Sequence, residues 1–448
     1  MIEKGAGNIL TRLEQSARVI ALVKLANVGL VLIWGFAVTY VFVRVLPLAE
    51  FQAFLLLVAF GNFTISAEFG LTSIIYARLR RHWLGQDLGL GQDSSGTDGG
   101  FRLEEMGLIF LLLSGLIVGA TALLLGAMAL GWLGTAMPLL FLLFFLSACL
   151  NLPALLAKRA LAAIDGNLVW ELLDCGRRLV TITLLLGVLA GLDVRLSVAL
   201  QLAVSILVIG YAIALLHRRL KMQGAHWLAF RAGGGHVRRH YLGDIGASAA
   251  FTVSEIVAYN APYFTIALAT GDARPMLVFD FLFKMTRALS MLVRAMVEAA
   301  LPRITRAYHA DDGTRFRQII RRALGAGAVA ALLMSVALLL FGQLLFAELF
   351  DHKAAIGLGE VALVCLGLAA LAVICVSVYI QGALGRFRYL LGRSVPFLAG
   401  SLASVPLALM VGGVRFDDAF LAFYALTLVG TAALHGWSLY RLARTVQA

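Results

Sequence analysis

The sequence predicts an all-α polytopic membrane protein with about twelve transmembrane helices in two six-helix bundles around a central cavity. Hydrophobic residues make up 61% of the 448 residues, and the mean hydropathy is +0.91. Charged residues are 14% of the chain, against about 25% in an average soluble protein. Twelve stretches also reach the length of about 20 mostly apolar residues that a helix needs to cross a bilayer.

These stretches define the expected spans in chain order. An even number of spans predicts that both termini lie on one side of the membrane. The spans are expected at residues 22–46, 51–77, 106–131, 135–157, 171–191, 196–216, 245–269, 276–300, 321–346, 358–384, 392–412 and 418–440.

The twelve spans fall into two sets of six, which predicts an N-terminal bundle over 1–222 and a C-terminal bundle over 223–448. The N-terminal segment 1–21 mixes charged and apolar residues, and we expect it to lie on the cytoplasmic surface as an amphipathic helix. The connections 78–105 and 217–244 contain GQDSSGTDGG and RAGGGH. Both read as flexible loops, because glycine and short polar residues mark breaks between elements.

The basic residues predict the orientation of the spans. With both termini cytoplasmic, 26 of the 37 Lys and Arg residues fall in or beside the inner segments, and only four fall in the outer loops. Cytoplasmic loops carry such an excess of Lys and Arg. The net charge of +12 is therefore a signal of topology, and nucleic acid is not an expected partner.

Motifs for several kinds of chemistry are absent from the sequence. The four cysteines have no CxxC spacing, which argues against a zinc site. No GxxxxGK[ST], HExxH or GxSxG pattern occurs, so neither ATP hydrolysis nor a hydrolase site is expected. We therefore predict a protein that is not an enzyme and has no catalytic residues, bound metal or cofactor, apart from coupling to H⁺ or Na⁺.

The span at 276–300 contains five charged residues within DFLFKMTRALSMLVRAMVE. At about 100° per residue they fall within roughly ±40° of one line, so they share one narrow face. A charge at the centre of the bilayer costs roughly 2.5–3.5 kcal/mol and usually faces a hydrated cavity or an ionic partner. The charged residues are Asp280, Lys284, Arg287, Arg294 and Glu298.

Two interpretations of this face remain open from the sequence. Asp280 with Lys284, and Arg294 with Glu298, are i,i+4 pairs that could form a salt-bridge ladder. That ladder pairs the other charged residues of this face but does not include Arg287. This favours the second interpretation, a hydrated cavity that attracts anions.

The preceding span carries polar residues at the same spacing, among them Glu255 and Tyr259. We expect Glu255 to pair with an arginine of the span at 276–300. Alternatively, its carboxylate could exchange protons or bind Na⁺.

The first bundle offers fewer candidates. Lys24 and Asn27 lie one turn apart on the first span and could face the cavity, although Lys24 could instead extend to the inner surface. Arg177 and Arg178 are expected near the inner end of the span at 171–191, as interfacial anchors paired with acidic residues one turn away.

Residues 44–81 contain Arg44, an EF pair at Glu50 and an EFGL motif at Glu68, and residues 279–306 contain the charged face described above. These two segments resemble the polysaccharide transporters, the O-antigen and exopolysaccharide flippases of the multidrug/oligosaccharidyl-lipid/polysaccharide exporter superfamily. In that family an Arg ends the first helix, an E-[FY] pair opens the second and a D/E-F-G-L motif closes it. The segment FDFLFKMTRALSMLVRAMVEAALPRITR (279–306) is similar to the family's eighth helix. The first motif is matched in RVLPLAEFQAFLLLVAFGNFTISAEFGLTSIIYARLRR (44–81) by Arg44, Glu50, Phe51, Glu68, Phe69, Gly70 and Leu71.

The resemblance implies a multi-pass protein of the bacterial inner membrane that flips an undecaprenyl-pyrophosphate-linked oligosaccharide by alternating access, driven by an ion gradient. The implied partners are this lipid-linked oligosaccharide, membrane lipids, a polysaccharide polymerase and other assembly proteins of O-antigen, lipopolysaccharide or exopolysaccharide. The sequence departs from the family at Asn260, where many relatives carry an Asp, so Glu255 becomes the substitute for ion coupling.

Two other functions remain open, a multidrug or small-metabolite antiporter of the same fold and a membrane subunit of a polysaccharide synthase or export complex. The candidate residues are the same for each. The candidates for binding substrate are Arg287, Arg294, Lys284, Lys24, Asn27, Tyr259 and Asn260, and those for ion coupling or charge pairing are Glu255, Asp280, Glu298 and Glu68.

Overall fold

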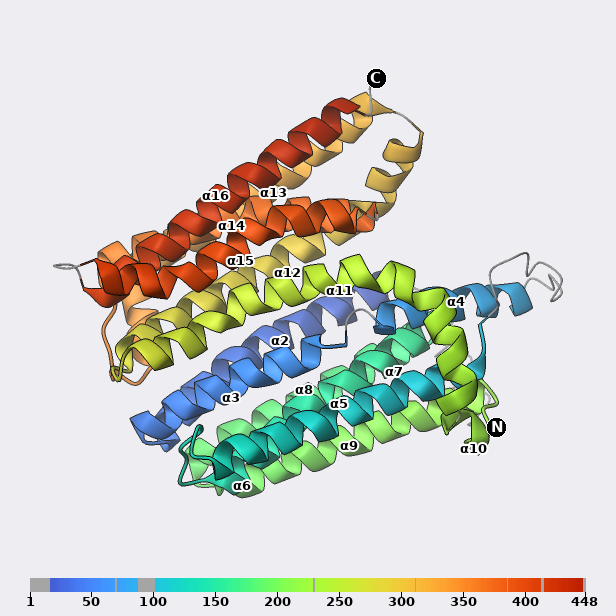
Figure 1. Ribbon diagram of the computed structural model, residues 1–448, viewed down its shortest axis with the longest axis horizontal. Coiled ribbons are helices and arrows are strands. Elements are labelled where there is room, and N and C mark those ends of the chain that lie inside the picture. The colour runs from blue at the N-terminus through green and yellow to red at the C-terminus, as the bar shows by residue number, and fades with distance from the viewer. Residues whose placement is uncertain are drawn as a thin grey trace. The chain divides into compact units, whose positions relative to one another are not determined.

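The computed structural model is helical, and its described residues contain no strand. Figure 1 shows the helices in chain order. The helices divide into two compact units, which the chain enters more than once. The residues described are 17–68, 71–87, 101–228, 230–310, 312–384, 386–411 and 415–445.

Unit 1 comprises Met1–Val41 and Phe60–Ala249, and unit 2 comprises Phe42–Ala59 and Ala250–Ala448. Three helices therefore contribute to both units. They are α2 (Ala17–Val45), α3 (Leu48–Ser66) and α11 (Phe230–Ala269).

The other helices each belong to one unit. Unit 1 contains α4 (Leu71–Asp87), α5 (Leu103–Ala129), α6 (Pro138–Cys149), α7 (Asn151–Ala163), α8 (Asn167–Gly187), the short 3₁₀ turn η2 (Val188–Ala190), α9 (Val194–Arg219) and α10 (Gly224–Trp227). Unit 2 contains α12 (Arg274–His309), α13 (Gly313–Leu349), α14 (Leu358–Ala383), α15 (Phe387–Met410) and α16 (Phe416–Thr445).

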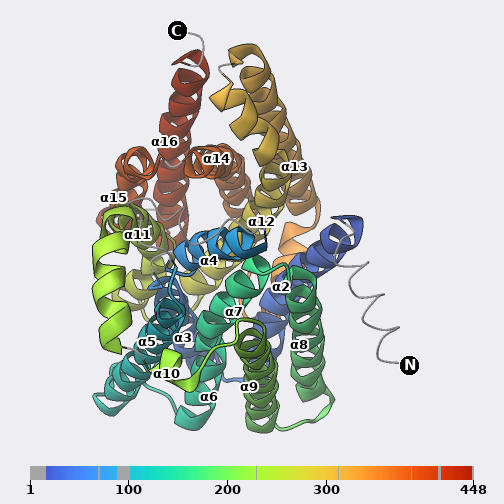
Figure 2. The same ribbon diagram turned by 90° about the vertical axis from the view of Figure 1, so that its right-hand side faces the viewer.

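In unit 1, α7, α8 and α9 pack against one another, and α6 lies against α9. Figure 2 shows these four helices side by side. Small residues allow the close packing, since Ala157, Ala160 and Ala212 are fully buried in the core. The result is a bundle that buries one face of α8.

In unit 2, α14 is the central helix, because α12, α13 and α16 all pack against it. Two thirds of its most apolar stretch is buried, a larger share than in the other apolar helices of the described chain. Its sequence explains this position, since LGEVALVCLGLAALAVICVSVYIQGA is apolar on all sides and such a helix is buried within its bundle.

Each of the twelve expected spans coincides with a helix or a pair of consecutive helices, and the chain is a multi-pass membrane protein. By length and apolar composition alone, nine stretches of the described chain qualify as spans. The expected spans that fail this test are α8, α11 and α12. These are the helices whose charged residues concern the functional site.

Two expected spans are each divided into two helices. Residues 51–77 form α3 and α4, and the Glu68 carboxylate accepts a hydrogen bond from the Thr72 backbone N–H at 3.0 Å, which caps the start of α4. Residues 135–157 form α6 and α7, which meet at Leu150. Pro153 accounts for this break, because proline lacks an N–H donor and clashes with the preceding turn.

The expected flexible loop at 217–244 is wrong for its second half. RAGGGH lies in α11, which begins at Phe230 and runs for 40 residues. Each glycine disfavours a helix by about 1 kcal/mol relative to alanine. Extending an existing helix avoids the unfavourable nucleation step, so the long apolar part of α11 supports this segment.

The expected flexible loop at 78–105 is wrong for its first part, because residues 78–87 belong to α4. Residues 88–100 lie outside the described residues, as does most of the expected amphipathic helix at 1–21. The two units meet along the chain at Ala249–Ala250. The predicted domain boundary at 222/223 stays a prediction.

Candidate functional site

The charged face of α12 begins with a buried ion pair. Asp280 is 2% exposed, and the Lys284 ammonium one turn later pairs with its carboxylate. The Tyr263 hydroxyl of α11 donates a hydrogen bond of 2.7 Å to the other carboxylate oxygen. The i,i+4 pair expected from the sequence is therefore formed, and a tyrosine that sequence reasoning did not identify completes it.

The next two arginines of α12 have exposed side chains within the described chain. Both Arg287 and Arg294 interact with other groups. The Arg294 guanidinium lies 5.8 Å from the centre of the Tyr379 ring on α14, within the range of a cation–π interaction. The Tyr379 hydroxyl is 3.2 Å from the Ser290 hydroxyl, which ties the same ring to α12.

The polar residues of α11 occupy different environments. Asn260 is buried and donates a hydrogen bond of 2.9 Å to the Ile256 carbonyl. Tyr259 packs edge-on against Phe397 at 4.9 Å. Glu255 is half-buried and forms no ion pair with an arginine within the described residues.

The expected pairing of Glu255 with an arginine of α12 is therefore wrong. The cations of α12 have other partners, since Lys284 pairs with Asp280 and Arg294 lies over Tyr379. Glu255 is left as a carboxylate that the described salt bridges do not neutralise.

The two candidates on α2, Lys24 and Asn27, differ in their exposure. Lys24 is exposed, whereas Asn27 is 5% exposed. Asn27 donates hydrogen bonds to Glu171 at 2.7 Å and to Asp174 at 3.0 Å. The side chain of Glu298 lies outside the described residues, so the second expected pair of the ladder stays a prediction.

A polar cluster on α8 contains the pairing of Arg177 and Arg178 with an acidic residue that the sequence predicted, but its burial was not predicted. The Asp174 carboxylate accepts hydrogen bonds from Arg177 at 2.6 Å and from Arg178 at 2.9 Å. The carboxylate of Glu171 is 3.5 Å from the Lys158 ammonium. Arg177 is only 6% exposed, so its expected role as an interfacial anchor is wrong.

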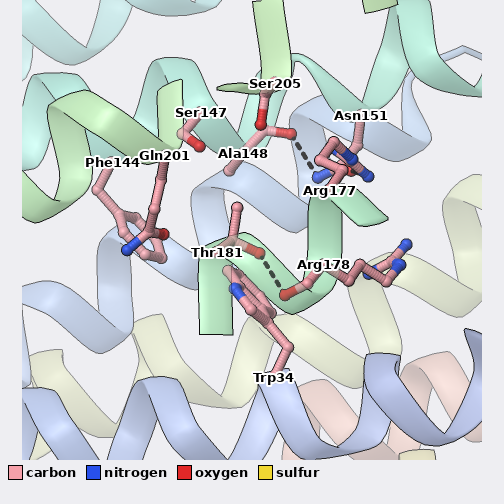
Figure 3. A pocket seen from close by; sticks show the side chains of 10 residues that line it. All are labelled: Trp34, Phe144, Ser147, Ala148, Asn151, Arg177, Arg178, Thr181, Gln201 and Ser205. Atoms are coloured by element: carbon pink, nitrogen blue, oxygen red, sulfur yellow. Dashed lines mark hydrogen bonds between the residues drawn. The ribbon is translucent and has the colours of Figure 1, made fainter. Parts of the chain in front are cut away.

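The two arginines line a cavity inside unit 1, which Figure 3 shows from close by. Five helices supply its walls: α2, α6, α7, α8 and α9. The rings of Trp34 and Phe144 lie nearly parallel at its edge, 6.4 Å apart. Its residues are Trp34, Phe144, Ser147, Ala148, Asn151, Arg177, Arg178, Thr181, Gln201 and Ser205, and none of them is acidic.

A signal for this cluster is present in the sequence. At about 100° per residue, positions 171, 174 and 178 fall within roughly 60° of one another. That is the pattern that indicated the charged face of α12. The interfacial interpretation of α8 instead relied on the position of its charges in the first half of the helix.

The fold is that of the MATE transporters. One solved structure, a mutant of the Vibrio cholerae MATE transporter VcmN, aligns over 97% of both chains with 16% identity and a TM-score of 0.61. An inward-facing multidrug resistance MATE transporter of the MOP superfamily aligns over 96% of this chain and 100% of its own, with 14% identity and a TM-score of 0.66. No protein-family model and no curated protein matches the sequence.

Proposed function

We propose that this protein is a secondary transporter that moves an anionic, lipid-linked substrate across the membrane by alternating access. The observation that carries this proposal is the face of α12, where the exposed Arg287 and Arg294 follow a buried ion pair. Ionisable residues inside membrane helices are rare and mark substrate or ion pathways. The MATE-like fold supports transport as the activity.

The positive character of this face supports an anionic substrate. Guanidinium groups form strong, paired hydrogen bonds with phosphate oxygens, and a cleft with one sign of charge concentrates ligands of the opposite sign. A lipid-linked oligosaccharide presents a pyrophosphate between its sugars and its lipid chain. The resemblance of segments 44–81 and 279–306 to polysaccharide flippases points to the same substrate, for O-antigen or exopolysaccharide assembly at the inner membrane.

A multidrug or small-metabolite antiporter is the second candidate. The structural comparisons support it more directly, because one of the aligned proteins is a multidrug resistance transporter. The charges of α12 argue against an organic cation as substrate. The exposed charges of the described part of α12 include two arginines. The acidic side chain described on this helix, Asp280, is buried and paired with Lys284.

Glu255 remains the candidate for coupling to H⁺ or Na⁺. Its carboxylate is half-buried on α11, and no described arginine neutralises it. A carboxylate in that position can gain or lose a proton as its hydration changes. We expect a polymerase and other assembly proteins to act on the transported substrate.

Removal of the two arginines tests the proposal in cells. We expect Arg287→Ala and Arg294→Ala to abolish surface polysaccharide while protein level and membrane insertion stay normal. Arg444→Ala is the matched control. Arg444 is also exposed and lies over a tyrosine ring, that of Tyr440, but both residues belong to α16 and not to α12. Full polymer in the Arg287→Ala/Arg294→Ala double variant would refute the role of this face.

A further inference from the structure

The cavity inside unit 1 has the composition of an anion site. We propose that it binds a phosphate-type oxoanion, either free in solution or as the phosphoryl group of a lipid. The cavity lies wholly in unit 1, whereas the face of α12 lies in unit 2. The proposal does not depend on the function proposed above.

The charge balance around the cavity is positive. Three cationic side chains, those of Lys158, Arg177 and Arg178, surround two carboxylates, those of Glu171 and Asp174. Neither carboxylate is among the residues that line the cavity, whereas both arginines are. The wall therefore presents net positive charge to whatever occupies the cavity.

Arg178 has the capacity to bind an anion. Its Nε donates to Asp174 at 2.9 Å, and no hydrogen bond within the described chain involves its two terminal nitrogens. The side chain is 21% exposed, and Arg178 is one of the residues that line the cavity. Because a guanidinium presents its donors as a planar fork, it matches the oxygens of phosphate better than it matches a spherical ion.

Other donors surround the same space. Figure 3 shows Ser147, Ser205 and Gln201 near one another, whereas Asn151 lies beside Arg177. The Gln201 amide donates to Ser197 at 3.3 Å and keeps its second N–H for another acceptor. Hydroxyl and amide donors around an arginine can bind the remaining oxygens of a tetrahedral anion.

The size of the cavity restricts the ligand. Its volume is about 50 Å³, room for roughly three to five waters at about 10–15 Å³ each. Drug-sized ligands occupy pockets of about 300–1,000 Å³, so neither a drug nor a sugar chain fits. A single phosphate, with one phosphorus and four oxygens, is small enough for this volume.

Binding to the purified full-length protein in detergent tests the proposal. We expect inorganic phosphate to bind by isothermal titration calorimetry in phosphate-free buffer, and Arg178→Gln to weaken binding about tenfold or more. Arg80→Gln is the matched control, because Arg80 pairs with Asp165 in unit 1 but does not line the cavity. We expect wild-type affinity for this control.

A second variant covers the case in which Arg178→Gln does not fold. Ser205→Ala removes a lining hydroxyl without disturbing the salt bridges, and we expect it to weaken binding severalfold. A parallel titration with a prenyl phosphate, using the prenol as blank, distinguishes the sources of the anion. Arginine-dependent binding of either phosphate supports the site. Failure of both to bind wild type, or equal binding by wild type and the cavity variants, would overturn it.

Discussion

At the scale of single residues, Asp280 is the buried half of an ion pair on α12. Its carboxylate is buried, accepts a hydrogen bond from Tyr263 and pairs with Lys284. A buried ion pair contributes little net stability, but the loss of one partner leaves an uncompensated charge that costs about 3–5 kcal/mol. The stability of the protein should therefore fall when one residue of the pair is replaced, and fall much less when both are replaced by uncharged residues.

We expect Asp280→Asn to lower the melting temperature of the purified protein more than Tyr263→Phe does. The tyrosine change removes one hydrogen bond to a charged group, which contributes about 1.5–3 kcal/mol. The double variant Asp280→Asn/Lys284→Met removes both charges at nearly constant volume and should recover most of the loss. If the double variant melts as low as the sum of the single changes predicts, the two residues are not coupled.

At the scale of elements, the packing of α10 against α5 depends on a single glycine. A Cβ at Gly107 would overlap the His226 carbonyl oxygen. The contact places Trp227 edge-on against Phe110 at 5.4 Å, and the Trp227 indole donates to His217 at 3.1 Å. Small residues that allow backbones to approach closely are typical of helix contacts in membranes.

We expect Gly107→Ala to displace α10 and lower the melting temperature. Gly115→Ala is the matched control on the same helix, because a Cβ there meets nothing within 4 Å. Alanine favours a helix by about 1 kcal/mol over glycine, so the control should be neutral or slightly stabilising. Equal destabilisation by both changes would show that the contact with α10 is unimportant.

Sequence reasoning predicted the Asp280–Lys284 pair of α12 and the ion pairs of the α8 arginines, but it missed the burial of the α8 cluster. In α12 the charges extend through the whole apolar stretch, so no interfacial explanation was available. In α8 the acidic residues lie two turns or less from the first residue, which is equally consistent with an interfacial end. Only packing against α7 and α9 shows that Asp174 and Arg177 are buried.

At the scale of the whole molecule, the apolar stretches of the sequence predicted the positions of twelve helical segments, because every backbone polar group within a bilayer must be satisfied inside a helix. Nine of these stretches in the described chain qualify as spans by length and apolar composition alone. The breaks after α3 and α6 were missed, since composition alone does not show where an apolar stretch changes direction. The assignment of residues 42–59 to unit 2 also has no signature in local sequence. It depends on contacts between distant segments, such as that of Arg44 with the Glu348 carbonyl at 2.7 Å.

The most direct test of the central claim is transport by the purified protein in liposomes under an imposed proton or sodium gradient. The liposomes would contain either a lipid-linked pyrophosphate oligosaccharide or an organic cation, and the fraction reaching the opposite leaflet or lumen would be measured. We predict gradient-dependent movement of the anionic lipid, lost in Arg287→Ala/Arg294→Ala and retained in Arg444→Ala, with no movement of the cation. Transport of the cation, with the lipid left in its original leaflet, would contradict the account.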